Sequence, residues 1–336
     1  MDYVMLKEVC SINMGQSPDS DSYNENGEGV PFFQGNADFG ERYPVTRKWC
    51  TAPTKMAERE DILISVRAPI GAMNYAKEKC CIGRGLSALT PDKTKVSPEF
   101  IFWLLKGKNE ELNRKGTGST FKAIGRKVLE EILVPDIELE TQLKYSAILE
   151  KVYAVIQNRK AELVKLDELI KSRFVELFGN KGENPNGYNE DTLGNLYKFQ
   201  YGKGNNIPED KGEYPCYGSN GIVGHHTEFN SEDAPIIGHI GAYAGIVNWG
   251  EGKHYVTYNG VICKLKTDRI NPIYGFYLLQ QQDFNRVATK GGGQPFVSYG
   301  DLESPTVVVP PIEVQNDYAM FANQIDKSKF VEKKIE

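Results

Sequence analysis

The chain has 336 residues, of which 40% are hydrophobic and 25% charged, and its formal net charge is −5. It has no run of about 18 uninterrupted apolar residues, and its start, MDYVMLKEVC, lacks a basic segment followed by an apolar one. We therefore expect neither a membrane span nor export. The six cysteines form no CxxC pair, so the sequence predicts no disulfide framework and no zinc site, and it fits the reducing cytoplasm.

Charge is unevenly spread along the chain. Residues 1–135 hold 19 Lys and Arg against 18 Asp and Glu, whereas residues 180–309 hold 10 against 14. A protein that holds nucleic acid by phosphate neutralisation alone usually shows a stronger basic excess. If this chain binds DNA, we expect a partner to supply much of the grip on the phosphates.

Residues 1–135 combine Gly, Pro and Asn with short apolar runs. The runs 62–66 and 86–89 read as strands separated by turns. A helix is expected to begin at Ser97, whose hydroxyl precedes Pro98 in the manner of an N-cap followed by a proline at the first helical position. This segment is predicted to be a mixed α/β domain.

The composition changes after Pro135. Residues 138–178 contain no Gly or Pro, and their apolar residues fall into a heptad register, which predicts one helix of about 40 residues, roughly 60 Å long. We assign residues 136–179 to this spacer helix, which is too long for a single small domain and needs a partner helix. The expected partner-binding positions on it are Leu149, Val152, Ile156, Leu163, Leu166 and Ile170.

The chain then repeats itself. Residues 115–135, KGTGSTFKAIGRKVLEEILVP, align without a gap on residues 290–310, KGGGQPFVSYGDLESPTVVVP, with seven identities. Further out, Ser97-Pro98 aligns with Asn271-Pro272, and residues 70–72 with residues 240–242. The period, near 180 residues, is that of a whole domain plus a connector.

The repeat predicts a second α/β domain over residues 180–309 and a second helix over residues 310–336, with Phe321 and Ile325 on its apolar face. The expected fold class is α/β (α+β): two mixed domains joined by long antiparallel coiled-coil helices, with an internal pseudo-twofold repeat. By alignment the second helix is about 17 residues shorter than the first. The sequence leaves open whether that difference is natural or a truncation.

Two short patterns resemble catalytic motifs. Residues 271–274, NPIY, differ by one residue from the loop with which adenine methyltransferases hold a flipped base. Their counterpart in the first copy keeps only the helix start, so we interpret the pattern as a helix N-terminus. Asp233 with residues 251–253, EGK, resembles a D…ExK magnesium site, but so short a pattern is weak.

Other catalytic signals are lacking. The sequence contains no P-loop and no glycine-rich cofactor loop between a strand and a helix. All four histidines lie in the second copy, and we interpret them as surface or contact residues: His225, His226, His239 and His254. The sequence therefore predicts no catalytic site.

Loops of the two copies suggest binding instead. The glycine-rich segments 115–118 and 290–293 fit either a backbone phosphate cradle or a flexible turn, and both interpretations stay open. The run 214–221, YPCYGSNG, mixes aromatic, small and amide residues that we expect on an exposed loop, where they can reach base edges. Its counterpart, residues 31–38, has the same character but a different sequence, as expected of two domains that read different targets.

Taken in order, these features resemble the specificity subunit of a Type I restriction-modification system. The resemblance covers essentially the whole chain: a target-recognition domain, a spacer helix, a second target-recognition domain and a second spacer. The residues that carry it are YPCYGSNGIVGHH from Tyr214, the strand-turns DILISVRAPIGA and PIIGHIGAYAG, and the paired ends ILVPDIELETQ and VVVPPIEVQ.

The resemblance implies a mechanism. Each target-recognition domain reads one half of a split double-stranded DNA sequence through the major groove, while the antiparallel helices set the gap and dock two methyltransferase subunits. S-adenosylmethionine comes with those subunits, and a motor-nuclease restriction subunit can join for cleavage. The chain itself is then a non-catalytic, cytoplasmic DNA-binding subunit without its own cofactor. The short second helix departs from the family pattern.

Two rival interpretations remain: a stand-alone DNA nuclease or methyltransferase with a duplicated scaffold, and a duplicated interaction protein that never touches nucleic acid. For DNA contact we select polar and basic loop residues near the repeated glycines. In the first domain these are Gln34, Asn36, Arg67, Arg84, Lys115, Ser119 and Lys122. In the second domain they are Lys203, Tyr217, Ser219, Asn220, His239 and Lys290.

Overall fold

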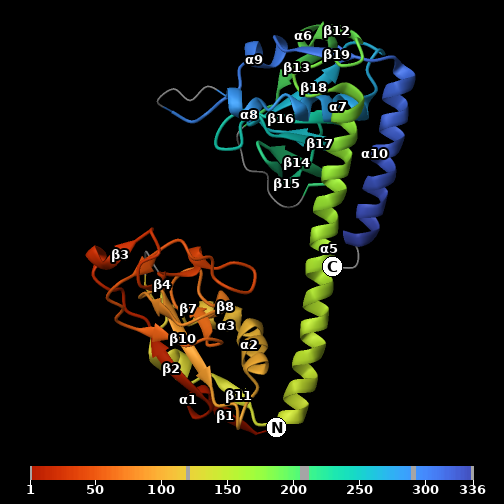
Figure 1. Cartoon of the computed structure of the whole chain (residues 1–336). Coiled ribbons are helices and arrows are strands. Elements are labelled where there is room, and N and C mark those ends of the chain that lie inside the picture. Colours follow the sequence, from red (N-terminus) through yellow and green to blue (C-terminus); the bar gives the residue numbers. More distant parts are fainter. Residues whose placement is uncertain (1, 119–121, 205–211, 289–292, 334–336) are drawn as a thin grey trace. The chain divides into compact units, whose positions relative to one another are not determined.

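The computed structural model describes residues 2–118, 122–204, 212–288 and 293–333 (Figure 1). The chain forms two compact units, residues 1–155 and residues 156–336, and each is described by itself below. The units divide the long helix between them, whereas the sequence assigned that helix a segment of its own. Within the described residues, no helix combines the length and the apolar character that a membrane span requires.

The described residues of unit 1 form three sheets. In the first, β1 (Tyr3–Met5) pairs antiparallel with β11 (Leu133–Pro135). A four-stranded sheet has the order β2 (Cys10–Met14), β10 (Leu86–Pro91), β7 (Ile62–Ser65) and β8 (Met73–Tyr75). A five-stranded sheet has the order β3 (Tyr23–Asn24), β5 (Trp49–Cys50), β4 (Val30–Phe33), β9 (Cys80–Ile82) and β6 (Met56–Ala57).

Helices of unit 1 follow the capping chemistry of the sequence. The helices are α1 (Leu6–Val9), α2 (Pro98–Gly107), α3 (Asn109–Arg114), α4 (Arg126–Glu130) and α5 (Leu139–Phe178), with 3-10 turns η1 (Ser20–Ser22) and η2 (Asn36–Asp38). The Ser97 hydroxyl accepts the N–H of Phe100 at 3.4 Å, as an N-cap does. The predicted helix starts at Ser97 and after Pro135 are confirmed, as are the strands at residues 62–66 and 86–89.

The core of unit 1 lies on both faces of strand β7. Ile62 and Ile64 pack into the cluster that contains Ile101 and Leu105 of α2, while Leu63 packs on the other face with Leu86. Successive side chains of a strand point to opposite faces, so a strand buried on both sides reads as a continuous apolar run. This explains the unbroken ILI of β7.

Unit 2 repeats this plan. Strand β12 (Asn189–Thr192) pairs antiparallel with β19 (Thr306–Val309). One six-stranded sheet has the order β13 (Tyr197–Tyr201), β18 (Gly260–Leu265), β16 (Ser231–Gly238), β17 (Val247–Val256), β14 (Tyr214–Gly218) and β15 (Gly221–His226). The helices are α6 (Leu193–Leu196), α7 (Pro272–Gln281), α8 (Phe284–Val287), α9 (Tyr299–Glu303) and α10 (Ile312–Lys333).

Equivalent hydrogen bonds correct two parts of the sequence alignment. The N–H of Gly71 donates to Ser65 O at 2.9 Å, and the N–H of Gly245 donates to Gly238 O at 2.8 Å. Both glycines have positive φ, 84° and 87°, and each leads into a strand that pairs antiparallel with its predecessor. Gly71 therefore corresponds to Gly245, and the alignment with Gly241 was wrong by four residues. The N–H groups of Ile124 and Val297 make matching bonds to Val66 O at 2.9 Å and to His239 O at 3.0 Å, so the gapless alignment, which matches Ile124 with residue 299, was wrong there by two residues.

In unit 2, helix α10 runs antiparallel to the second half of α5 (Figure 1). Phe174 of α5 packs edge-on against Tyr318 near the start of α10, with ring centroids 5.4 Å apart. Further along α10, Lys329 donates to Asp167, which lies earlier on α5. Of the predicted partner-binding positions, Ile170 and Ile325 are buried, and Leu163, Leu166 and Phe321 are partly buried. The remaining three, Leu149, Val152 and Ile156, are exposed.

Candidate nucleic-acid interface

In unit 1, backbone hydrogen bonds hold the ends of several strands side by side. The N–H of Gly85 donates to Gln34 O at 3.1 Å, that of Val66 to Gly85 O at 2.9 Å, and that of Ile124 to Val66 O at 2.9 Å. These bonds bring together the loops after β4, β9 and β7 and the segment before α4. We call this set of loops, with the exposed Gln34, Arg84, Arg67 and Lys122, row 1.

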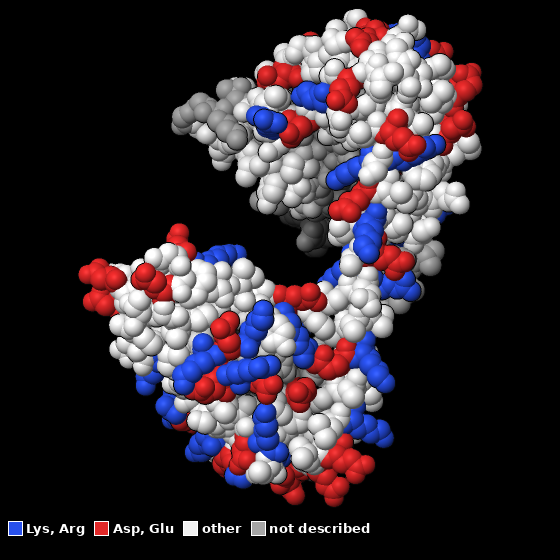
Figure 2. Space-filling view, in the orientation of Figure 1, with Lys and Arg blue, Asp and Glu red and all other residues white. Residues whose placement is uncertain are grey.

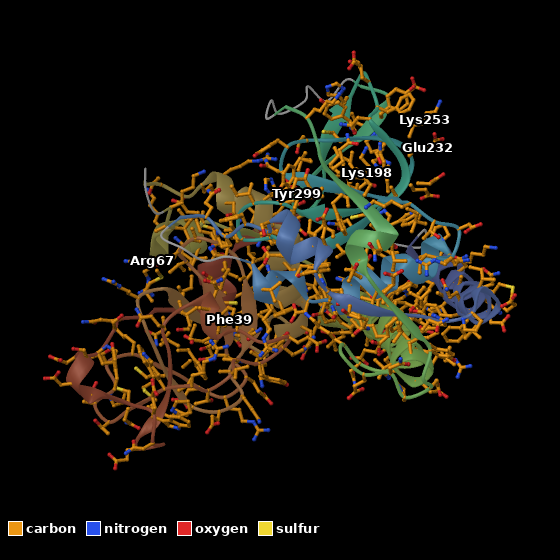
Figure 3. All side chains as sticks on the ribbon, turned by 90° about the horizontal axis from the view of Figure 1, so that it is seen from above. Phe39, Arg67, Lys198, Glu232, Lys253 and Tyr299 are labelled. Carbon is orange, nitrogen blue, oxygen red and sulfur yellow. The ribbon has the colours of Figure 1, made fainter. Side chains whose placement is uncertain are left out.

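Row 1 is cationic and polar. The Arg67 side chain is shown in Figure 3, and within the described ranges the Arg67, Arg84 and Lys122 side chains form no ion pair or hydrogen bond. The Gln34 amide donates to Ser17 Oγ at 2.9 Å, which fixes its orientation. A free guanidinium presents paired N–H donors that match the acceptors of guanine or of a phosphate.

Unit 2 builds the equivalent surface with two of these bonds, and the N–H of Thr257 donates to Tyr217 O at 3.0 Å as that of Gly83 does to Phe33 O at 2.8 Å. The N–H of His239 donates to Asn259 O at 2.8 Å, as Val66 does to Gly85, and that of Val297 donates to His239 O at 3.0 Å, as Ile124 does to Val66. We call these loops, with Gly218, Tyr258, Ile240 and Pro295, row 2. Position by position they correspond to Gln34, Arg84, Arg67 and Lys122.

An aromatic stack supports row 2. The ring of Tyr201 stacks on His239 at 4.2 Å and on Tyr299 at 4.3 Å, and His239 also meets Tyr258 edge-on at 5.1 Å. Burial raises the pKa of the Tyr201 hydroxyl. Sequence reasoning missed Tyr201, Tyr258 and Tyr299, because only the hydrogen-bond register reveals that Tyr258 takes the place of Arg84.

The other residues of unit 1 that were predicted to contact DNA are less accessible or lie outside the described residues. Lys115 is paired with Glu111 at 2.6 Å, one turn earlier on α3. Asn36 is half-buried in η2. Ser119 lies outside the described residues, so its predicted role stays a prediction.

In unit 2 the run 214–221 is a β-hairpin rather than a loop. Tyr217 is 7% exposed in strand β14 and packs with Ile236 and Val256, and burial raises the pKa of its hydroxyl. The expectation of an exposed Tyr217 was wrong. His239 is also buried, beneath Tyr258, whereas Ser219 and Asn220 form the turn and Lys203 is exposed. Lys290 lies outside the described residues.

The short catalytic-looking patterns have structural explanations. The Asn271 side chain accepts the N–H groups of Ile273 at 2.9 Å and Tyr274 at 3.2 Å, which confirms the helix N-terminus. The carboxylate of Asp233 accepts the N–H of Gly252 at 2.7 Å and so braces the bulged β16–β17 pair. Among the described residues no cluster of His, Cys, Asp and Glu is placed to hold a metal ion.

Acidic and basic side chains are mixed on the surface. Figure 2 shows Lys and Arg interleaved with Asp and Glu on the visible face of each unit. The electrostatic attraction of such a surface for DNA is modest.

Comparison with known proteins identifies the family. Residues 1–168 and residues 185–336 each match the family model of the Type I restriction modification DNA specificity domain. The chain therefore belongs to this family, and the two matches fall on the two halves of the repeat.

Similar proteins support the same family. The MjaX specificity subunit of a type I restriction enzyme from Methanocaldococcus jannaschii is 43% identical over 165 residues, 49% of this chain and 39% of that one. The EcoprrI specificity subunit from Escherichia coli is 28% identical over 247 residues, 68% of this chain and 61% of that one. The chain thus spans less than two thirds of the length of these relatives.

A solved structure shows the fold. The S subunit of a type I restriction-modification system from M. genitalium has a TM-score of 0.62 to this chain at 18% identity, covering 99% of this chain and 91% of that one. At this low identity the likeness shows the fold alone.

Proposed function

We propose that the chain is the DNA sequence-recognition subunit of a Type I restriction-modification complex, with no catalytic role of its own. Each unit reads one half of a bipartite double-stranded site. The observation that carries this proposal is the correspondence of rows 1 and 2: matching backbone bonds hold two sets of loops whose side chains differ. A shared frame with divergent loops suits two readers of different half-sites.

The proposal gives α5 and α10 the role of an antiparallel coiled coil that relates the units by a pseudo-twofold axis and sets the gap between half-sites. This role of α5 is supported by two different faces of its first half. One face packs on unit 1, where Gln142 and Ser146 are buried, Glu150 bonds Arg42 at 2.8 Å, and Tyr153 packs on Trp103 at 5.4 Å.

The other face of α5 is apolar and open. Its residues are 36–58% exposed: Tyr145, Ile148, Leu149, Val152, Val155 and Ile156. At 100° per residue these positions share one stripe of the helix. An exposed apolar stripe of this size marks a protein-binding surface, and we assign it to docking of two methyltransferase subunits.

The partners complete the chemistry. The methyltransferase subunits bring S-adenosylmethionine and the catalytic residues, and a motor-nuclease restriction subunit joins for cleavage in the cytoplasm. The chain's net charge of −5 fits this proposal, because the methyltransferase subunits supply much of the contact with the DNA phosphates.

DNA binding by the purified chain, alone and with the methyltransferase encoded beside it, tests the proposal. We expect tight, sequence-selective and salt-dependent binding with the partner only. Methylation or cleavage by the chain alone would support a stand-alone enzyme. Lack of selectivity in a stable complex would favour an interaction protein that does not read DNA.

A further inference from the structure

The two rows differ in chemistry at every equivalent position. Where row 1 has Arg84, row 2 has Tyr258, and where row 1 has Lys122, row 2 has Pro295. The other two pairs are Arg67 with Ile240 and Gln34 with Gly218. Each pair exchanges a hydrogen-bonding side chain for one that is apolar, aromatic or absent.

We propose that the units read their half-sites by different chemistry, an inference that rests on the DNA-recognition function above. Row 1 reads purine edges, guanine foremost, through hydrogen bonds from Arg84 and Arg67. Row 2 reads thymine methyl groups through the exposed rings and apolar side chains around Tyr258. The DNA substrate is therefore a site with a guanine-containing half and a thymine-containing half.

The case for row 1 rests on free donors in fixed loops. The backbone N–H of Arg84 donates to Ser17 Oγ at 3.3 Å, and the loop that follows is tied to Gln34 and Val66. The guanidinium itself is exposed and forms no hydrogen bond or ion pair within the described part of the chain. In the major groove, guanine offers two adjacent acceptors, O6 and N7, which fit the two parallel donors of an arginine.

The case for row 2 rests on a rigid aromatic surface. Tyr258 is 42% exposed, and His239, held by a contact of its ring Nδ1 with Tyr258 O at 3.1 Å, stacks beneath on Tyr201. Phe296 is 38% exposed and pairs with Ile240 in an isolated antiparallel β-bridge. Thymine is the base whose major-groove edge carries a methyl group, and apolar side chains recognise it by contact.

The two segments that carry the rows also differ in net charge. The segment that carries row 1 has one excess positive charge, whereas the segment that carries row 2 has four excess negative charges. Lys203 is an exposed cation next to row 2, on the loop after β13, and its place suits a phosphate contact rather than base reading. Row 2 therefore has the composition of a surface that discriminates by shape and methyl contact.

Base analogues in the bipartite site test the inference with the unaltered chain in its methyltransferase complex. The site is first mapped from cellular methylation, so a missing site counts against the proposed function and not against this inference. Uracil then replaces thymine, which removes only the methyl group, in one half-site at a time. Separately, 7-deazaguanine replaces guanine, which removes the N7 acceptor, in one half-site at a time.

We expect opposite responses from the two half-sites. Uracil should weaken binding about fourfold per contacted methyl group in one half only. Loss of guanine N7 should weaken binding between about five- and 150-fold in the other half only. Equal responses of both halves to both analogues, or both responses in the same half, would overturn the inference.

Variants assign each half to its unit. Arg84→Lys keeps the charge and loses the planar pair of donors, so it should reduce the response to 7-deazaguanine while keeping the salt dependence. Tyr258→Ser removes the ring and should remove the response to uracil, whereas Tyr258→Phe keeps the ring and should leave it. If Tyr258→Phe behaves like Tyr258→Ser, the hydroxyl rather than the ring reads the base, and the methyl-contact mechanism is wrong.

Discussion

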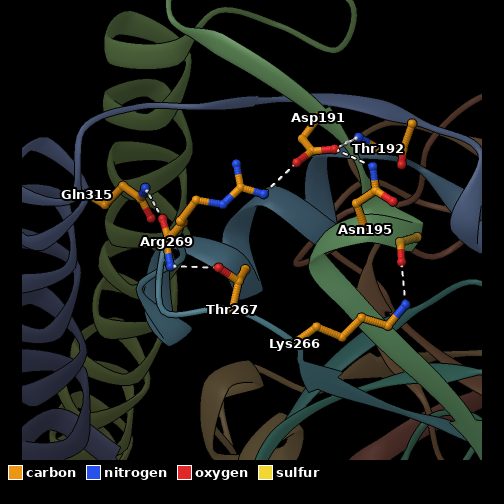
Figure 4. A network of polar contacts seen from close by, with 8 residues as sticks. Asp191, Thr192, Asn195, Lys266, Thr267, Arg269 and Gln315 are labelled. Atoms are coloured by element: carbon orange, nitrogen blue, oxygen red, sulfur yellow. Dashed lines mark hydrogen bonds and ion pairs between the residues drawn. The ribbon is translucent and has the colours of Figure 1, made fainter.

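Gln142 and Gln315 make the same three hydrogen bonds in the two halves of the chain. Gln142 accepts the N–H of Ser97 at 2.9 Å, and Gln315 accepts that of Asn271 at 2.9 Å. Each amide nitrogen then donates to two carbonyls, Lys95 and Ile137 for Gln142, Arg269 and Pro310 for Gln315. Figure 4 shows the bond from Gln315 to Arg269, whose guanidinium also pairs with Asp191.

This glutamine ties the start of each long helix to its globular domain. Both residues are at most 2% exposed, and each is the fourth residue of its helix. Gln142→Ala should lower the free energy of unfolding by about 2–4 kcal/mol, because three buried backbone groups lose their partner. Urea unfolding followed by tryptophan fluorescence measures the change.

The same loss is expected for Gln315→Ala. Gln324→Ala, an exposed glutamine on α10, is the matched control and should change stability by less than about 0.5 kcal/mol. A large effect of the control together with a small effect at Gln142 would contradict the anchoring role.

The open stripe on α5 predicts a binding defect without a folding defect. The double variant Leu149→Ser/Val152→Ser should abolish co-purification with the methyltransferase subunit, since it removes apolar contact area from a docking surface. Thermal unfolding of the isolated chain should be nearly unchanged, because the two side chains are 42% and 51% exposed. Lys151→Ser, on another face of the same turn, is the control. Normal complex formation by the double variant would exclude this stripe as the docking site.

Row 1 predicts a difference between two lysines. Lys122→Ala should weaken binding to all DNA sequences and lower the slope of log affinity against log salt by about 1. Lys115→Ala should have a smaller effect, because Lys115 is already paired with Glu111 at 2.6 Å. Titrations at several salt concentrations measure both, and equal slopes would contradict the assignment.

Asn220→Ala, in the hairpin turn of unit 2, should instead relax sequence preference at one half-site.

His254 predicts a pH effect on the stability of unit 2. Its ring is fully buried, and burial lowers the pKa of the imidazole below its ordinary 6.5, although the contact with the Gly252 carbonyl and the nearby Asp233 and Glu232 oppose the shift. The unfolded chain takes up a proton below pH 6.5 while the folded chain stays neutral there. Stability present above pH 6.5 should therefore be lost as pH falls from 6.5 toward the folded pKa.

The melting temperature between about pH 7.5 and 5.5 measures this loss. His254→Asn keeps a side-chain amide near the Gly252 carbonyl that the ring contacts at 2.8 Å, and it should flatten the pH dependence. The exposed His225→Asn should not. Identical pH profiles for all three proteins would show that another group causes the effect.

Local chemistry made much of the fold predictable. The caps at Ser97 and Asn271 and the unbroken helical segment after Pro135 depend on a few neighbouring residues, and the structure has them where expected. The repeat was visible because both copies keep glycines and a Val-Pro pair at the same spacing, although the matching bonds of Gln142 and Gln315 place the structural match two residues away from that alignment. Family membership follows from the same features and is confirmed by two matches along the chain.

The candidate site was less predictable, because it depends on contacts between distant segments. A bulge between Cys216 and Tyr217 breaks the alternation of β14 and buries both side chains, so a composition typical of loops misled the assignment of Tyr217. Tyr258 gave no local signal at all. It joins Tyr201 only through the register of β13 and β18, and different loop lengths in the two copies hide its match to Arg84.

The most direct test of the central claim is methylation-site mapping in cells that express this chain with the methyltransferase encoded beside it, against cells that lack the chain. We predict a methylated motif of two half-sites separated by a fixed gap, present only when the chain is expressed. Methylation that is unchanged without the chain, or no motif although both proteins are soluble and associated, would contradict the claim that this chain reads the DNA sequence.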